Sequence, residues 1–147
     1  MNKTVKAELT KLKKSYSEIA VKYNEALLSA VKEMLTNTFH IPQGEGMNIK
    51  EFLDDGIVDI PAKYETPKDH AANYVLFGFC IDKSGKLAVK AYDIEDSDCE
   101  WTFSEYDFTI SELSDILSIL EAIEEEIENG NYILDEDLCV VEKQSIL

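Results

Sequence analysis

Arginine is absent from this sequence, so lysine supplies all 14 of its basic side chains. Arginine is the side chain that usually grips a carboxylate or a phosphate with two parallel hydrogen bonds. The chain therefore lacks the usual phosphate clamp and the arginine finger. Acidic residues are abundant by contrast, and 30 of them give a net charge of −16. This charge argues against nucleic-acid binding and against adhesion to anionic membranes, because both need a basic surface.

Proline, glycine and long apolar runs are also scarce. With 3 prolines and 6 glycines, the sequence is neither collagen-like nor of low complexity. The longest apolar run, 74–81, is far shorter than the ~20 residues that cross a bilayer. No apolar stretch of signal-peptide length follows the first lysines, so we expect a cytoplasmic protein. The length of 147 residues and an apolar content of 45% predict one domain over 1–147 with a real core.

The three cysteines are odd in number and widely spaced: Cys80, Cys99 and Cys139. We therefore expect free thiols, without a disulfide framework or a zinc site. Cys99 stands between Asp98 and Glu100, whose negative field disfavours a reactive thiolate. The sequence predicts no catalytic residue, no metal site and no cofactor.

Residues 3–38 contain neither proline nor glycine and predict a long helix within an N-terminal segment of 1–40. Apolar residues recur there in alternating steps of four and three, at Val5, Leu9, Leu12, Tyr16, Ile19, Tyr23, Ala26 and Ala30. This spacing is a heptad seam. A straight helix of that length spans roughly 50 Å at ~1.5 Å per residue, more than the diameter of a compact domain of this size. The helix therefore either breaks near Tyr23–Asn24 and packs back on the sheet, or projects and self-associates as a homo-oligomer through 5–30.

The rest of the chain alternates strand and helix patterns. A connector at 41–72 contains a short helix at 48–55, opened by Asn48. The segment 73–147 holds the sheet and an acidic helix. Its predicted strands are 74–81, 87–94, one around Trp101 and Phe103, and 138–141.

The acidic helix begins at a capping box, Thr109-Ile-Ser-Glu112, and ends at Gly130. Together these elements predict an α+β fold: an antiparallel sheet of three to five strands, with a long N-terminal helix and a C-terminal-half helix packed on one face.

Negative charge is concentrated in the second half of the chain. Between Lys90 and Lys143 there are eighteen acidic residues and no basic one. Glutamates at 124–128 also lie at the helix end where the dipole disfavours them, which suggests a functional reason. We therefore expect a surface that docks a basic partner protein, as an inhibitor or a neutralising protein. The candidate partner-binding residues are Glu121, Glu124, Glu125, Glu128, Asp96, Asp98, Trp101 and Tyr132.

Two other interpretations stay open. We expect 93–100 to form an acidic turn between two predicted strands. Its carboxylates are suited to Ca²⁺, but from Asp96 the sixth position of an EF-hand loop is Trp101 where glycine is required. A small ligand-binding or enzymatic domain with a pocket between sheet and helices is the alternative function. Its candidate base is His70, which follows Asp69 in a proline-flanked loop, while His40 falls at the end of the first helix.

Overall fold

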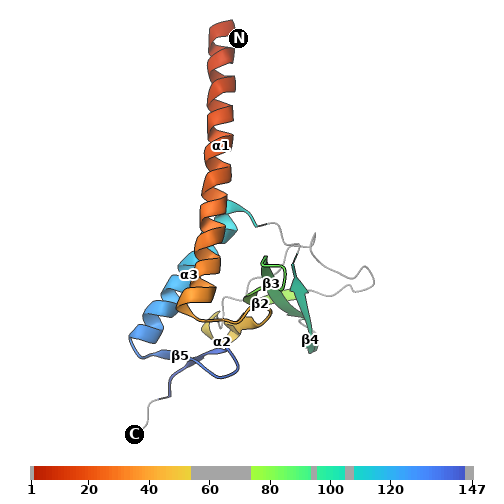
Figure 1. Cartoon of the computed structure of the whole chain (residues 1–147), viewed down its shortest axis with the longest axis vertical. Helices are drawn as coiled ribbons and strands as arrows, with labels where there is room; N and C mark the ends of the chain where they lie inside the picture. The colour runs from red at the N-terminus through yellow and green to blue at the C-terminus, as the bar shows by residue number, and fades with distance from the viewer. Residues whose placement is uncertain (1, 54–73, 94–95, 105–107, 145–147) are drawn as a thin grey trace.

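A computed structural model describes residues 2–53, 74–93, 96–104 and 108–144 of the chain. Four antiparallel strands form the main sheet in the order β1-β2-β3-β4, and a separate two-stranded sheet pairs β5 with β6. Two long helices pack against one face of the main sheet (Figure 1). The predicted α+β fold, with its long N-terminal helix and its helix in the C-terminal half, is confirmed.

Helix α1 (Lys3–Glu33) is continuous, and a π-helical turn, η1 (Met34–Thr38), extends it. Asn2 caps its start, because the Asn2 side chain accepts hydrogen bonds from the backbone of Thr4 and Val5 at 2.7 and 3.2 Å. Of the two alternatives that the sequence left open, a break near Tyr23–Asn24 is wrong, since α1 runs through both residues in regular helix. The N-terminal part of α1 projects beyond the rest of the molecule instead (Figure 1).

Strands β2 (Tyr74–Ile81) and β3 (Leu87–Asp93) form the hairpin that their sequences predicted. Asp82 closes the turn between them, and Gly85 adopts a positive φ of 87° there. Strand β1 (Gly46–Asn48) pairs with β2 and was not predicted. A Cβ at Gly78 would overlap the carbonyl oxygen of Met47, so glycine at this position permits the close approach of β1.

Strand β4 (Asp96–Phe103) begins earlier than expected. The prediction that 93–100 forms an acidic turn is therefore wrong over 96–100, where the backbone pairs with β3. Acidic residues are tolerated here because β4 is the outer edge of the sheet, and charge on an edge strand discourages pairing with other chains.

Helix α3 (Ile110–Glu128) has the predicted capping box. The Thr109 hydroxyl accepts from the Glu112 backbone at 3.1 Å, and the Glu112 carboxylate accepts from the Thr109 backbone at 2.9 Å. Gly130 follows the helix with a positive φ of 79°. Strand β6 (Val140–Glu142) overlaps the predicted strand 138–141, whereas β5 (Tyr132–Leu134) was not predicted.

The short helix α2 (Lys50–Leu53) lies within the range 48–55, whose last two residues are outside the described part. The Asn48 side chain accepts a hydrogen bond from the Lys50 backbone at 2.9 Å, as the expected cap requires.

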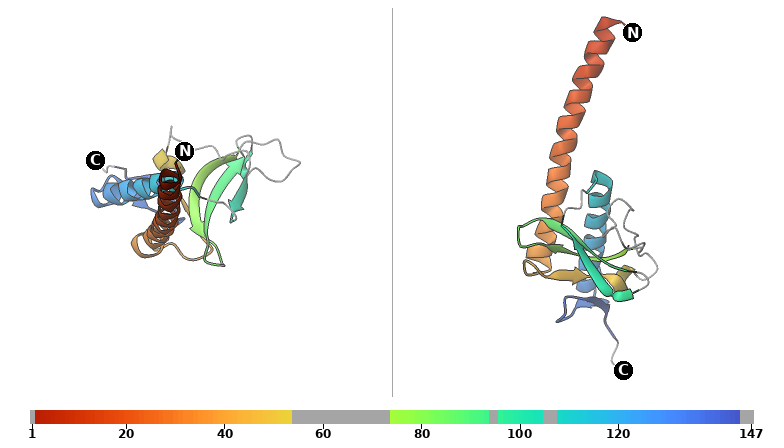
Figure 2. Two further views of the ribbon diagram at one scale, coloured as in Figure 1. Left: turned by 90° about the horizontal axis from the view of Figure 1, so that it is seen from above. Right: turned by 90° about the vertical axis from the view of Figure 1, so that its right-hand side faces the viewer.

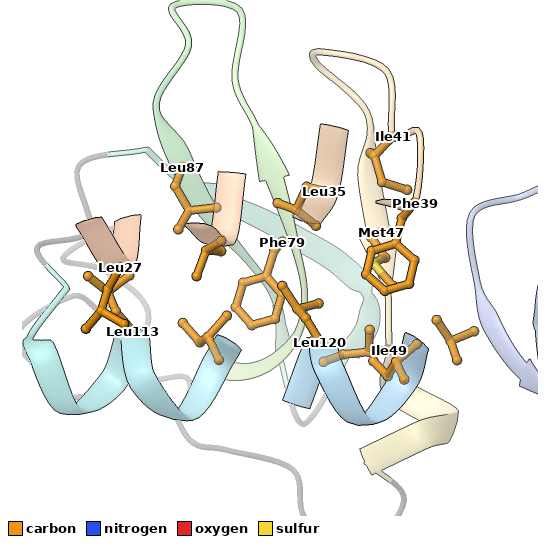
Figure 3. Packing of buried hydrophobic residues seen from close by; sticks show 14 residues of the cluster. Leu27, Leu35, Phe39, Ile41, Met47, Ile49, Phe79, Leu87, Leu113 and Leu120 are labelled. Carbon is orange, nitrogen blue, oxygen red and sulfur yellow. The ribbon is translucent and has the colours of Figure 1, made fainter. Parts of the chain in front are cut away.

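The core lies between the sheet and the two long helices (Figure 3). Its fully buried side chains include Val31 of α1, Leu35 of η1, Met47 of β1, Phe79 of β2, and Leu113 and Leu120 of α3. These apolar side chains form one packed cluster between the sheet and the helices. The lower half of α1 is thus held in the core while its upper half is not.

Candidate functional site

Four glutamates on the C-terminal half of α3 form the α3 acidic face: Glu121, Glu124, Glu125 and Glu128. Their spacing of i, i+3, i+4 and i+7 places them on one side of the helix. Glu121, Glu125 and Glu128 are exposed and Glu124 is half-buried. The four line a shallow open depression of about 650 Å³ together with Ser118, Ala122 and Asn129. The sequence-predicted helical residues therefore lie together on the surface.

The electrostatic setting of the α3 acidic face is unfavourable for the isolated helix. Glu125 and Glu128 lie in the last turn of α3, at the negative end of the helix dipole, and this turn contains no basic residue. Glu121 with Glu125, and Glu124 with Glu128, are also like-charge pairs at i,i+4, each of which costs a few tenths of a kcal/mol. Glu126, in contrast, has a structural partner, since it accepts a hydrogen bond from the Asn131 side chain at 3.1 Å.

The predicted residues on β4 lie elsewhere. Asp98 is exposed on β4, and the structure describes the backbone of Asp96 at the start of this strand but not its side chain. Viewed from above, α3 and β4 occupy opposite sides of the molecule (Figure 2). The predicted set is therefore split between two surfaces.

Trp101 contributes to the packing of the sheet. Its side chain is half-buried and packs against a small cluster of Val89, Ala91 and Phe103. Ala91 lies directly opposite Trp101 across the β3–β4 ladder. Much of the Trp101 indole therefore packs against the sheet and is not free to contact a partner.

Tyr132 lies at the base of α3, on β5, and is half-buried. Its ring meets the ring of Phe52 edge-on, with centroids 5.2 Å apart and planes at 71°. Tyr132 also lines an open depression of about 700 Å³ with Glu126, Glu142 and Lys143. This tyrosine joins α2 to β5, and part of it faces solvent at the same end of the molecule as the α3 acidic face.

The turn after α3 carries two further exposed acidic residues. Glu136 and Asp137 are exposed in the turn between β5 and β6, which follows the C-terminal end of α3. The sequence marks these residues as an acidic turn at 135–137. Only the pairing of β5 with β6 shows that this turn lies at the C-terminal end of α3.

Neither described cysteine has the environment of a nucleophile. Burial raises the pKa of the Cys80 thiol above its ordinary value. The pKa of Cys139 is raised first by burial and then by the carboxylates of Asp135 and Asp137. A raised pKa disfavours the reactive thiolate at neutral pH. The side chain of Cys99 is outside the described residues.

The histidines and the acidic residues were the other candidates for chemistry. His40 is exposed just after η1, with a positive φ of 55°, and His70 lies outside the described residues. Within the described ranges, no group of three or more His, Cys, Asp or Glu side chains is arranged to hold a metal ion. Nor does any helix in those ranges have the length and apolar character needed to span a membrane.

Comparison of the chain with protein-family models, with curated proteins and with solved structures gives no match in any of the three.

Proposed function

We propose that this chain is an acidic protein-binding domain of the cytoplasm, which docks a basic surface of another protein through the α3 acidic face. It acts by binding, not by catalysis, as an inhibitor or neutralising protein. The observation that carries the proposal is the placement of four glutamates on one side of α3, two of which, Glu125 and Glu128, lie in the last turn, where the helix dipole disfavours their charge.

A basic partner relieves this unfavourable placement. Lysine or arginine side chains of a partner would offset both the like-charge repulsion and the helix dipole. The surrounding chain supplies no such compensation in sequence, because no basic residue lies between Lys90 and Lys143. A surface of one sign also steers a partner of opposite sign and accelerates association.

The test is a charge reversal with a matched control. Glu124, Glu125 and Glu128 are changed to lysine in one variant. In the control, Glu18, Glu25 and Asp115 are changed to lysine; these are exposed and lie outside the α3 acidic face. Both triples change the net charge equally, so a difference between them reports position and not total charge.

Tagged wild-type protein is first used to capture partners from a lysate of the source organism at low and moderate salt. The captured protein is then purified and titrated with the wild type and both variants. We expect one basic protein whose affinity falls at least tenfold for the α3 triple, about 1.4 kcal/mol, and falls with added salt. Equal affinity for the two triples, or an affinity that ignores salt, would overturn the proposal.

A further inference from the structure

The upper half of α1 carries an uncovered apolar stripe, separate from the α3 acidic face. Six large side chains form this stripe, which we call the α1 seam: Val5, Leu9, Leu12, Tyr16, Ile19 and Tyr23. Their exposed fractions run from 41% at Leu9 to 75% at Tyr16. This part of α1 stands clear of the other described elements in Figure 1 and in the right-hand view of Figure 2.

The body of the molecule meets α1 below the α1 seam and on another side. The Asn24 side chain donates a hydrogen bond to the Phe108 carbonyl at 3.3 Å, which marks the level where the chain leading to α3 reaches α1. Towards the C-terminal end of the helix, α1 packs into the core through Leu27 and Val31, and η1 through Leu35. Ala26 continues the line of the seam along the body and is itself exposed. The described residues therefore leave the α1 seam open.

The spacing of the α1 seam is the heptad spacing of a coiled coil. Steps of four and three place Leu9, Tyr16 and Tyr23 at a positions, and Val5, Leu12 and Ile19 at d positions. In proteins most helical stability comes from packing of an apolar face, and the described residues do not supply that packing to the α1 seam. A second helix with the same period would cover the stripe along its whole length.

We propose that the α1 seam pairs with the α1 seam of a second copy of this chain, as a parallel two-stranded coiled coil. The residues that flank the seam support self-pairing. In a parallel pair in register, Glu8 at position g faces Lys13 at position e of the second copy, and symmetry forms this attractive contact twice. In an antiparallel pair of the same stretch, Glu8 would instead face Lys22 of the second copy, which is attractive. That arrangement, however, places Lys13 of one copy against Lys13 of the other, which is repulsive.

Two exposed apolar residues on opposite sides of α1 provide a matched test of the seam. Ile19 is 65% exposed in the seam, and Val21 is 57% exposed about 200° around the helix. Neither side chain is part of the core, so both Ile19→Glu and Val21→Glu leave the body folded. Sedimentation equilibrium then compares the self-association of the two variants with that of the wild type.

We expect the wild-type mass to rise with concentration from 16.6 kDa to twice that value. Ile19→Glu weakens the dimer at least tenfold, because each copy loses a buried apolar side chain, while Val21→Glu leaves it unchanged. A wild type that stays monomeric up to about 0.5 mM protein, or equal effects of the two substitutions, would overturn self-pairing through the seam. The α1 seam would then be left to a different protein or to a lipid surface. Particles larger than a dimer would overturn the two-stranded form.

The orientation has its own test. Lys13→Glu places two glutamates face to face in the parallel dimer and weakens it, and the double change Glu8→Lys with Lys13→Glu restores it. In the antiparallel dimer, Lys13→Glu removes no attraction and leaves acidic residues where lysines met. The double change then replaces the attraction between Glu8 and Lys22 with repulsion between two lysines, which weakens the antiparallel dimer further. Loss of association in the double variant would therefore overturn the parallel arrangement. These outcomes do not depend on the α3 acidic face.

Discussion

Asp82 shows how one carboxylate fixes the turn between β2 and β3. Its Oδ1 accepts hydrogen bonds from the Ser84 hydroxyl at 2.6 Å and from the backbone N–H groups of Ser84 and Lys86, both at 2.9 Å. These bonds favour the ionised form and lower the pKa of Asp82 to about 2, with the Ser84 side chain as the largest cause. The turn therefore depends on a charge that resists protonation.

This lowered pKa fixes the sign of a pH dependence. An aspartate with a lower pKa in the folded than in the unfolded chain contributes stability above the unfolded value of ~3.9, and the contribution is lost as the pH falls towards the folded value. We expect the Asp82 carboxyl carbon to titrate near pH 2 by NMR. Ser84→Ala should raise that pKa towards the ordinary range. An unchanged pKa in Ser84→Ala would contradict this account of the turn.

At the scale of elements, α3 carries glutamates at both of its ends, with opposite consequences. Glu112 lies in the first turn, where the dipole and the capping box favour a carboxylate, whereas Glu125 and Glu128 lie near the last turn. The same side chain thus stabilises one end of the helix and destabilises the other. The proposed binding role explains why the α3 acidic face retains glutamates that destabilise the end of the helix.

Neutralising these glutamates should therefore change stability in opposite directions. We expect Glu125→Gln and Glu128→Gln each to raise the free energy of unfolding by about 0.3–1 kcal/mol, because each removes a charge from the negative end of the dipole. Glu112→Gln should lower it by a similar amount. Urea unfolding of the three single variants measures this. Destabilisation by either of the first two would show that these carboxylates have a structural task in the chain itself.

The sequence predicted the elements whose patterns are local. Strand β2 and helix α3 match their predicted ranges within about a residue, because β-branched and aromatic residues mark the strand and a capping box and Gly130 bound the helix. Strands β1 and β5 have three residues each and were missed. So short a strand is defined by its partner, as Met47 is by Phe79 across the ladder.

For the candidate site too, the sequence predicted what depends on local spacing and not what depends on the tertiary fold. Helical spacing alone put Glu121, Glu124, Glu125 and Glu128 on one side of a helix. Whether Asp98 would join them depends on the order of strands in the sheet, which is a tertiary property. The heptad pattern of α1 likewise looks the same in a helix that packs back and in one that projects.

At the scale of the whole molecule, charge is divided between the two ends of the chain. Residues 3–23 hold six lysines and two glutamates, whereas residues 91–142 hold eighteen acidic residues and no basic one. Two copies that associate through α1 also bring together bodies of strongly negative charge. The proposed partner of the α3 acidic face meets that charge with the opposite sign.

The two proposed contacts should therefore respond to salt in opposite directions. Raising NaCl from ~50 to ~300 mM screens the repulsion between two acidic bodies and should tighten the dimer, while it weakens docking of a basic protein. Sedimentation equilibrium measures the first effect and titration with the captured partner measures the second. If salt weakens both contacts, direct ion pairs outweigh the repulsion between bodies in the dimer.

The packing of α1 against α3 also sets an order of events during synthesis. The lower half of α1 is made early, but its core contacts Leu113 and Leu120 belong to a helix that begins at Ile110. At ~5–20 residues per second, the ribosome adds the intervening residues in roughly 4–15 s. Throughout this interval Leu27, Val31 and Leu35 have no helix α3 to cover them. A nascent chain therefore exposes both halves of α1 at once, and folding of the body waits for the ribosome to reach α3.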